Sequence, residues 1–139
     1  MTALSTSDGL VLRGFAARTD CWYELGPDIQ EFLAVGCFQR SIADPATDVV
    51  LNLQHGYAGS GLPLARTSAG SLKLSEVTKG PETGLWLEAT LDPDDPDAQI
   101  LERKLASGAL DGQASFSFRS NYSGVGSVPG PAAVCGDEA

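Results

Sequence analysis

The sequence predicts a single α+β domain that is mainly β. Apolar and polar residues alternate over several short stretches, which is typical of strands with one buried face. Only one longer stretch carries both helix-start and helix-stop signals. The 16 glycines and 8 prolines predict many turns between short elements, and hydrophobic residues make up 42% of the 139-residue chain, enough for one modest core.

The expected elements follow one another in a simple order. Apolar alternation at 71–77 and again at 84–91, with a Gly/Pro loop between them, predicts a β-hairpin. The other expected strands cover residues 9–17, 29–34, 48–54, 64–67 and 115–119, with a loop at 20–28 and a short helix at 36–42.

The one long helix is expected to begin in the acidic segment 92–97. Its aspartates and prolines supply an N-cap, a proline in the first turn and negative charge at the positive end of the helix dipole. Gly108 is expected to end the helix. Ile100, Leu101 and Leu105 are expected to face the core.

Net charge and hydropathy exclude two classes of partner. The net charge of −9 and the pI near 4.3 argue against nucleic acid, because no stripe of Lys and Arg is present to neutralise phosphates. No apolar run of about 18 residues is long enough to span a membrane, and no signal peptide is expected. We therefore expect a cytosolic protein with no membrane association.

The cysteines and acidic residues predict no bound metal and no cofactor. Cys21, Cys37 and Cys135 are odd in number and share no C-x-x-C spacing, so neither a disulfide framework nor a zinc site is expected. The acidic segment 92–97 has no EF-hand pattern, and its aspartates are interpreted as helix caps rather than calcium ligands.

The stretch 115–118, Ser-Phe-Ser-Phe, is the strongest candidate for chemistry. Period-2 alternation puts both phenylalanines on one face of a strand and both serines on the other. A serine nucleophile needs a base to take its proton, and His55 is the single histidine of the chain. We interpret Ser115 as the nucleophile and His55 as its base. Ser117, on the same face, stays an alternative, as does a plain exposed position for both serines.

The order of several short motifs resembles the prohead (procapsid maturation) serine proteases of tailed phages. No single motif is specific, but together they cover roughly residues 9–120. They are residues 13–16 (Arg-Gly-Phe-Ala), 36–41 (Gly-Cys-Phe-Gln-Arg-Ser), the strand ending in His55, 62–67 (Leu-Pro-Leu-Ala-Arg-Thr), 70–74 (Gly-Ser-Leu-Lys-Leu), 84–89 (Gly-Leu-Trp-Leu-Glu-Ala) and 115–118.

The resemblance implies a herpesvirus-protease-like fold, which is a small, closed or nearly closed antiparallel β-barrel with flanking helices. It implies a serine endopeptidase that cleaves scaffold and major capsid protein segments inside the immature procapsid, in the host cytoplasm. The family's base falls on His55 and its nucleophile on Ser115. Two departures concern local geometry: no carboxylate neighbours His55 in Gln54-His55-Gly56, and Ala65 replaces the family's usual glycine.

Glu88 is the candidate for the carboxylate that orients the imidazole. It lies between His55 and Ser115 in the chain, on an expected strand. The alternative interpretation is a plain cross-strand ion pair between Glu88 and a Lys or Arg. Arg66 or Arg119 is a further candidate, for positive charge near the oxyanion.

We expect residues 1–122 to form the catalytic domain and 123–139 a Gly/Pro-rich tail. The rival function is a non-catalytic capsid-assembly or scaffold domain on the same fold. An unrelated Ser-His esterase is disfavoured, because no G-x-S-x-G elbow is present. The sequence leaves cleavage specificity and oligomeric state open, a homo-oligomer included.

Overall fold

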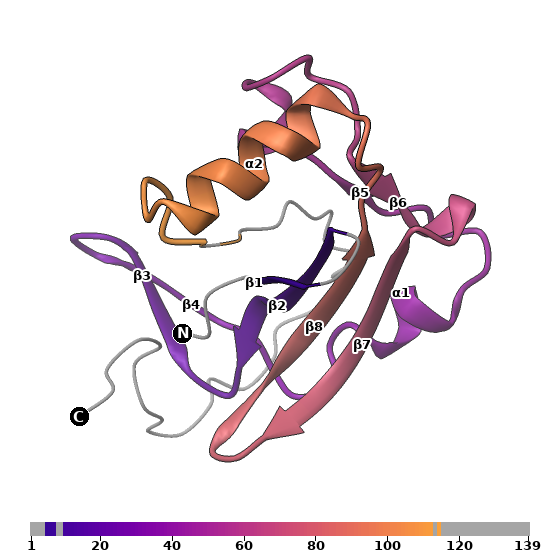
Figure 1. The fold of residues 1–139 in the computed structure, drawn as a ribbon. Helices are drawn as coiled ribbons and strands as arrows, with labels where there is room; N and C mark the ends of the chain where they lie inside the picture. Colours follow the sequence, from indigo (N-terminus) through magenta and orange to yellow (C-terminus); the bar gives the residue numbers. More distant parts are fainter. Residues whose placement is uncertain (1–4, 8–9, 113, 115–139) are drawn as a thin grey trace.

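The structure, a computed structural model, describes residues 5–7, 10–112 and 114. Its centre is a four-stranded antiparallel sheet in the order β1-β2-β8-β7 (Figure 1). These strands are β1 (Ser5–Ser7), β2 (Val11–Thr19), β7 (Leu72–Lys79) and β8 (Glu82–Thr90). The predicted hairpin of residues 71–91 is confirmed, with β7 and β8 paired from Leu72↔Ala89 to Lys79↔Glu82.

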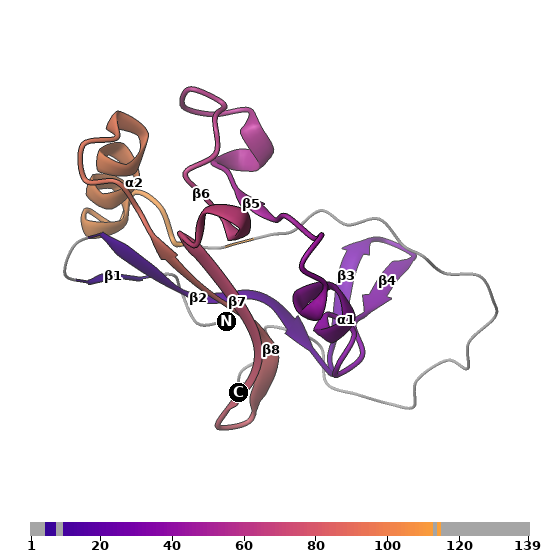
Figure 2. The same cartoon turned by 90° about the vertical axis from the view of Figure 1, so that its right-hand side faces the viewer.

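Two smaller β units and two helices complete the described part. They are the pair β3 (Trp22–Gly26) with β4 (Ile29–Phe32), the pair β5 (Val50–Leu51) with β6 (Ala65–Arg66), α1 (Gln39–Ala43) and α2 (Pro96–Ala106), and the 3-10 turns η1 (Gln54–Gly56) and η2 (Thr67–Ala69). Figure 2 shows α2 and the β5–β6 pair on the same side of the central sheet, with the β3–β4 hairpin set apart.

The core lies between the sheet and the elements that cover this face. Strand β8 buries Leu85, Leu87 and Ala89, and the alternate residues between them point to the other face. Ala98 and Leu101 of α2 belong to the same buried cluster, as does Ala65 of β6. The period-2 pattern of β8 therefore decides which face of the sheet receives α2 and β6.

Helix α2 starts as predicted but turns a different face inward. Asp95 is the N-cap, and its side chain accepts a hydrogen bond from the Asp97 amide at 2.9 Å. Leu101 is buried, but Ile100 is 49% exposed, so its predicted inward position is wrong. Ala98, which is 0% exposed, lies one turn before Leu101 and completes the buried stripe instead.

Two of the predicted elements between residues 20 and 54 are corrected. The expected loop at 20–28 contains strand β3, because a turn around Pro27 lets Trp22 pack on Phe32 with their ring centroids 5.1 Å apart. The expected strand at 48–54 is reduced to Val50–Leu51, because β5 pairs with β6 over only these two residues. The positive φ of 44° at Gln54 then ends the extended backbone.

The short helix predicted at 36–42 is present as α1, shifted to Gln39–Ala43. The Glu76 carboxylate of β7 holds the turn before it, accepting hydrogen bonds from the Gly36 amide at 2.7 Å and the Phe38 amide at 2.5 Å. Partial burial, with the nearby Glu76 charge, raises the pKa of the Cys37 thiol between them. This free thiol is therefore protonated at neutral pH.

Cys21 corrects the expectation that no disulfide forms. It is 4% exposed and disulfide-bonded. Sequence spacing could not indicate this bond, because pairing depends on which thiols the fold brings together.

The closed barrel is not found among residues 5–7, 10–112 and 114. In the described sheet, β1 and β7 each pair with one neighbour, which leaves the sheet open at both edges. The expected strand 115–119 and the boundary at residue 122 lie outside the described residues. No helix in the described part is long and apolar enough to cross a membrane.

Gly84 provides a test of the central strand pair. A β-carbon at this position would overlap the carbonyl oxygen of Ala17 and lie 3.0 Å from the Cα of Arg18. We expect Gly84→Ala to lower the free energy of unfolding by about 2–3 kcal/mol, because β2 and β8 must move apart. Urea unfolding followed by circular dichroism measures the change.

Gly26→Ala is the matched control, because a β-carbon there meets no atom within 4 Å. Its effect should stay within about 0.5 kcal/mol. Equal stability of the two variants would mean that β2 and β8 do not approach as closely as described.

Candidate active site

A cavity of about 770 Å³ lies between the central sheet and α2. Its walls are largely apolar and come from β2, β7, β8 and α2. Leucines from all four elements line it, namely Leu12, Leu72, Leu74, Leu85, Leu87 and Leu101. A few polar residues also line it, and they are Asp48, Asn52, Gln54, His55 and Asp111. An apolar cavity with few convergent polar groups is typical of a ligand or substrate site.

His55 is held in an unusual backbone conformation. It lies in η1 with φ 56° and ψ 25°, and the preceding Gln54 also has a positive φ, of 44°. Two consecutive non-glycine residues in the left-handed region are costly and persist only where the surrounding structure enforces them. The His55 side chain is exposed, so solvent reaches the imidazole at the cavity. The local fold thus places an exposed histidine at the edge of the apolar cavity.

The β5–β6 pair beside His55 is fastened by Asp48. One carboxylate oxygen accepts from the Nε and Nη2 of Arg66, with the Nε at 3.1 Å, and the other accepts from the Ser68 amide at 3.1 Å. The Arg66 guanidinium and the Ser68 amide hold the pKa of Asp48 far below its usual value. Arg66, a sequence candidate for charge near an oxyanion, is thus engaged by Asp48.

Ser115 and Ser117 lie outside the described residues. The chain that leads to them does line the cavity, through Leu110, Asp111 and Ala114. Ala114 directly precedes Ser115 in the sequence. His55 and the residue before the predicted nucleophile therefore share one cavity.

Glu88 is not brought to this cavity. Its neighbours Leu87 and Ala89 face the core, so Glu88 points to the other face of the sheet. Its carboxylate accepts a hydrogen bond from the Nε of Arg13, the residue paired with it across β2 and β8, at 3.0 Å. This geometry is that of the cross-strand ion pair, the alternative interpretation of Glu88.

Asp111 is a carboxylate that the sequence interpretation missed. It lines the cavity together with His55 and Asp48. The only signal in the sequence is an aspartate between the long helix and the Ser-Phe-Ser-Phe stretch. No three His, Cys, Asp or Glu side chains of the described ranges cluster as a metal ion would require.

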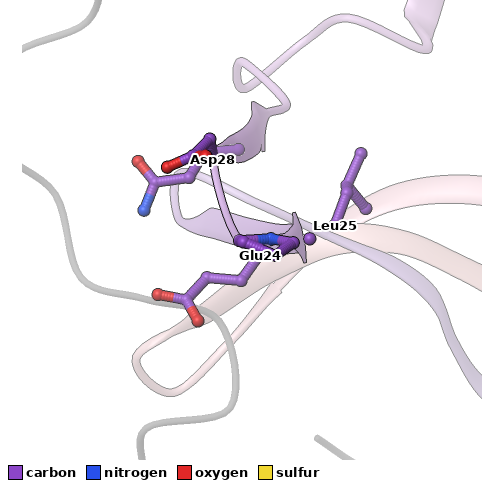
Figure 3. A pocket seen from close by; sticks show the side chains of 6 residues that line it. Glu24, Leu25 and Asp28 are labelled. Carbon is purple, nitrogen blue, oxygen red and sulfur yellow. The ribbon is translucent and has the colours of Figure 1, made fainter.

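A second hollow, of about 750 Å³, lies at the turn of the β3–β4 hairpin. In Figure 3, Glu24 and Asp28 lie on one side of the turn and the Leu25 side chain on the other. All of its lining residues come from the hairpin itself, between Glu24 and Gln30. It contains no serine, cysteine or histidine, and we assign no chemistry to it.

Comparison with protein families shows to which family the chain belongs. The sequence profile of the caudovirus prohead serine protease family matches residues 1–127. The chain belongs to this family. Comparison with curated proteins and with solved structures gives no match.

Membership supports a role as a prohead serine protease for this chain. The family acts within the procapsid in the host cytoplasm, and its substrates are capsid and scaffold proteins. The resemblance found in the ordered motifs is thereby confirmed at the level of the family. The match says nothing further about which residues of this chain react.

The contacts of Asp48 lead to a prediction about the stability of the β5–β6 pair beside His55. We expect Asp48→Asn to loosen the β5–β6 pair at pH 7, where the carboxylate is fully ionised. Hydrogen exchange should show lower protection of the Leu64 and Thr67 amides, which donate to the carbonyls of Leu51 and Val49. Asp28→Asn, a charge-matched change on the β3–β4 hairpin, should leave both amides protected.

The pH dependence follows from the lowered pKa of Asp48. A carboxyl whose pKa is depressed by folding stabilises the native state above its unfolded value of 3.8, and that contribution declines as the pH falls below it. The difference in the free energy of unfolding between wild type and Asp48→Asn should therefore become smaller below pH 3.8. If this difference in the free energy of unfolding stays constant down to about pH 2.5, the ion pair between Asp48 and Arg66 does not stabilise the fold.

Proposed function

We propose that this chain is a serine endopeptidase in which Ser115 is the nucleophile and His55 its general base. The observation that carries the proposal is the shared cavity: His55 lines it, and so does Ala114, the residue before Ser115. Family membership supplies the reaction class. The single histidine leaves His55 as the only imidazole of the chain.

The proposed reaction proceeds through an acyl-enzyme. The Ser115 hydroxyl attacks the scissile carbonyl carbon while the His55 imidazole takes its proton. The imidazolium then returns that proton to the leaving amine as the peptide C–N bond breaks. Water, deprotonated by the same imidazole, hydrolyses the ester and regenerates the serine. Imidazole suits both steps because its ordinary pKa lies near neutrality.

A carboxylate is needed to fix the imidazole tautomer. Glu88 is the candidate that the sequence suggested, but its bond to Arg13 and its place on the other face argue against it. Asp111 lines the same cavity as His55 and precedes Ser115 by four residues. We favour Asp111 as the orienting group, with Glu88 as the alternative to be tested beside it.

The proposed substrates are extended segments of the major capsid protein and of the scaffold. The apolar cavity walls suit at least one large apolar substrate side chain next to the reacting groups. We also propose that the described sheet is part of a herpesvirus-protease-like barrel to which residues 115–119 contribute a strand. A homo-oligomer is compatible with this function. A non-catalytic capsid-assembly domain is the rival outcome.

Labelling by a fluorophosphonate, measured as intact mass, tests the nucleophile and the base. Wild type should gain one adduct, whereas Ser115→Ala should gain none. His55→Ala should label at least about 10³-fold more slowly. Ser117→Ala is the matched control and should label like wild type, because it removes the same hydroxyl two residues away.

Two results would contradict the assignment of Ser115 as the nucleophile. An adduct that survives Ser115→Ala but not Ser117→Ala would move the nucleophile to Ser117. Absence of any adduct, on free protein and on assembled procapsids, would favour the non-catalytic assembly domain.

Asp111→Asn and Glu88→Gln separate the two candidates for the third group. We expect Asp111→Asn to slow labelling by roughly 10²–10⁴-fold, because the tautomer of His55 is no longer fixed. Glu88→Gln should label within about threefold of wild type, because an exposed cross-strand pair contributes little. The reverse ranking would restore Glu88 as the orienting carboxylate.

A further inference from the structure

The segment that follows His55 is a glycine-rich loop with little packing to hold it. Residues 56–61 contain three glycines, Gly56, Gly59 and Gly61, all with positive φ values of 90°, 64° and 73°. Tyr57 is 92% exposed and Leu62 is 70% exposed, so neither large side chain anchors the loop. A segment of this composition has high conformational freedom unless polar contacts restrain it.

One carboxylate on α2 provides such a restraint. Asp97, in the first turn of the helix, accepts hydrogen bonds through a single oxygen from the Ser60 amide at 2.8 Å and from the Ser60 hydroxyl at 2.5 Å. Hydrogen bonds to an ionised acceptor are stronger than neutral ones. Both bonds to Ser60 lower the pKa of Asp97, so it is ionised at neutral pH.

The backbone of the loop is shaped to receive this carboxylate. A β-carbon on Gly59 would lie 2.8 Å from the Asp97 carboxyl carbon, so the loop backbone approaches this carboxylate closely at a glycine. The two ends of the loop also meet, since a β-carbon on Gly61 would lie 3.1 Å from the Gly56 carbonyl oxygen. The Tyr57 amide at the start of the loop donates to the Gln54 carbonyl of η1 at 3.0 Å, so the loop begins as a continuation of that turn.

We infer that Asp97 and Ser60 form a clamp that positions His55 by fastening the loop after it to helix α2. This inference rests on the proposed function for its catalytic meaning, but the clamp itself is a structural claim. His55 is one residue before Gly56, where the loop begins, and its left-handed backbone has to be maintained by its surroundings. Asp97 is thus a positioning residue that acts through Ser60 and the loop.

Nuclear magnetic resonance of the single histidine tests the clamp without relying on activity. We expect Asp97→Ala and Ser60→Ala to shift or broaden the His55 ring signals and to speed amide exchange in residues 56–62 by roughly tenfold. Ser60→Thr keeps the hydroxyl and should behave like wild type. The melting temperature and amide exchange in β2, β7 and β8 should change little.

Asp94→Ala is the matched control for charge. This variant also removes an acidic group just before α2, but the Asp94 side chain is exposed and lies outside the clamp. Its His55 ring signals should coincide with those of wild type. The inference is overturned if Asp97→Ala leaves the ring signals and the loop exchange as they are in Asp94→Ala.

Fluorophosphonate labelling then tests whether the clamp affects the reactivity of the proposed nucleophile. Asp97→Ala and Ser60→Ala should label roughly tenfold more slowly than wild type, because a displaced base transfers the proton less well. Ser60→Thr should restore the rate. If wild type does not label, the proposed protease function fails while the resonance experiment still decides the clamp. If the ring signals move but labelling does not, the clamp holds the loop without positioning the base.

Discussion

The pairing of β2 with β8 is the constraint on which the rest of the described structure depends. It runs from Val11↔Thr90 to Thr19↔Thr83, with one irregularity between Phe15 and Ala17. Gly84 allows the two backbones to approach, and the buried face of β8 then presents leucines to α2 and β6. On the opposite face, Phe15 packs edge-on to Trp86 at 5.2 Å, which ties the same two strands by their other side chains.

The proposed reactive groups lie in irregular parts of the chain next to the central sheet. His55 lies in a 3-10 turn after a two-residue strand, and Asp111 lies after the end of α2. Short elements of this kind contribute little cohesion of their own. The polar contacts of Asp48 and Asp97 supply the restraint that packing does not. A rigid sheet that supports functional loops, with polar contacts holding those loops in place, is common in proteins.

The sequence predicts the regular elements well because their signals are local. Alternation in β7 and β8 and the capping signals of α2 required no knowledge of distant residues. Contacts between residues far apart in the chain could not be predicted from the sequence. Nothing near Glu88 in the chain indicates that Arg13, 75 residues away, takes its carboxylate. Likewise, the left-handed backbone at His55 and the contact of Asp97 with Ser60 depend on how separate segments meet. The family, in contrast, could be identified from the order of its motifs alone.

Helix α2 lies in the chain between the segment of the proposed base, His55, and that of the proposed nucleophile, Ser115. Its first turn is hydrogen-bonded to the loop that follows the proposed base. Beyond its end, the Leu110 amide donates to the Lys104 carbonyl of the last turn, on the chain that leads to the proposed nucleophile. At 1.5 Å per residue, the 11 residues of α2 make a rod of roughly 16 Å. In the proposed mechanism, this helix therefore sets the spacing between the segments that carry the base and the nucleophile. An inserted residue would turn one end by about 100° relative to the other. The length of this helix, more than its surface composition, is therefore what evolution would be expected to hold fixed.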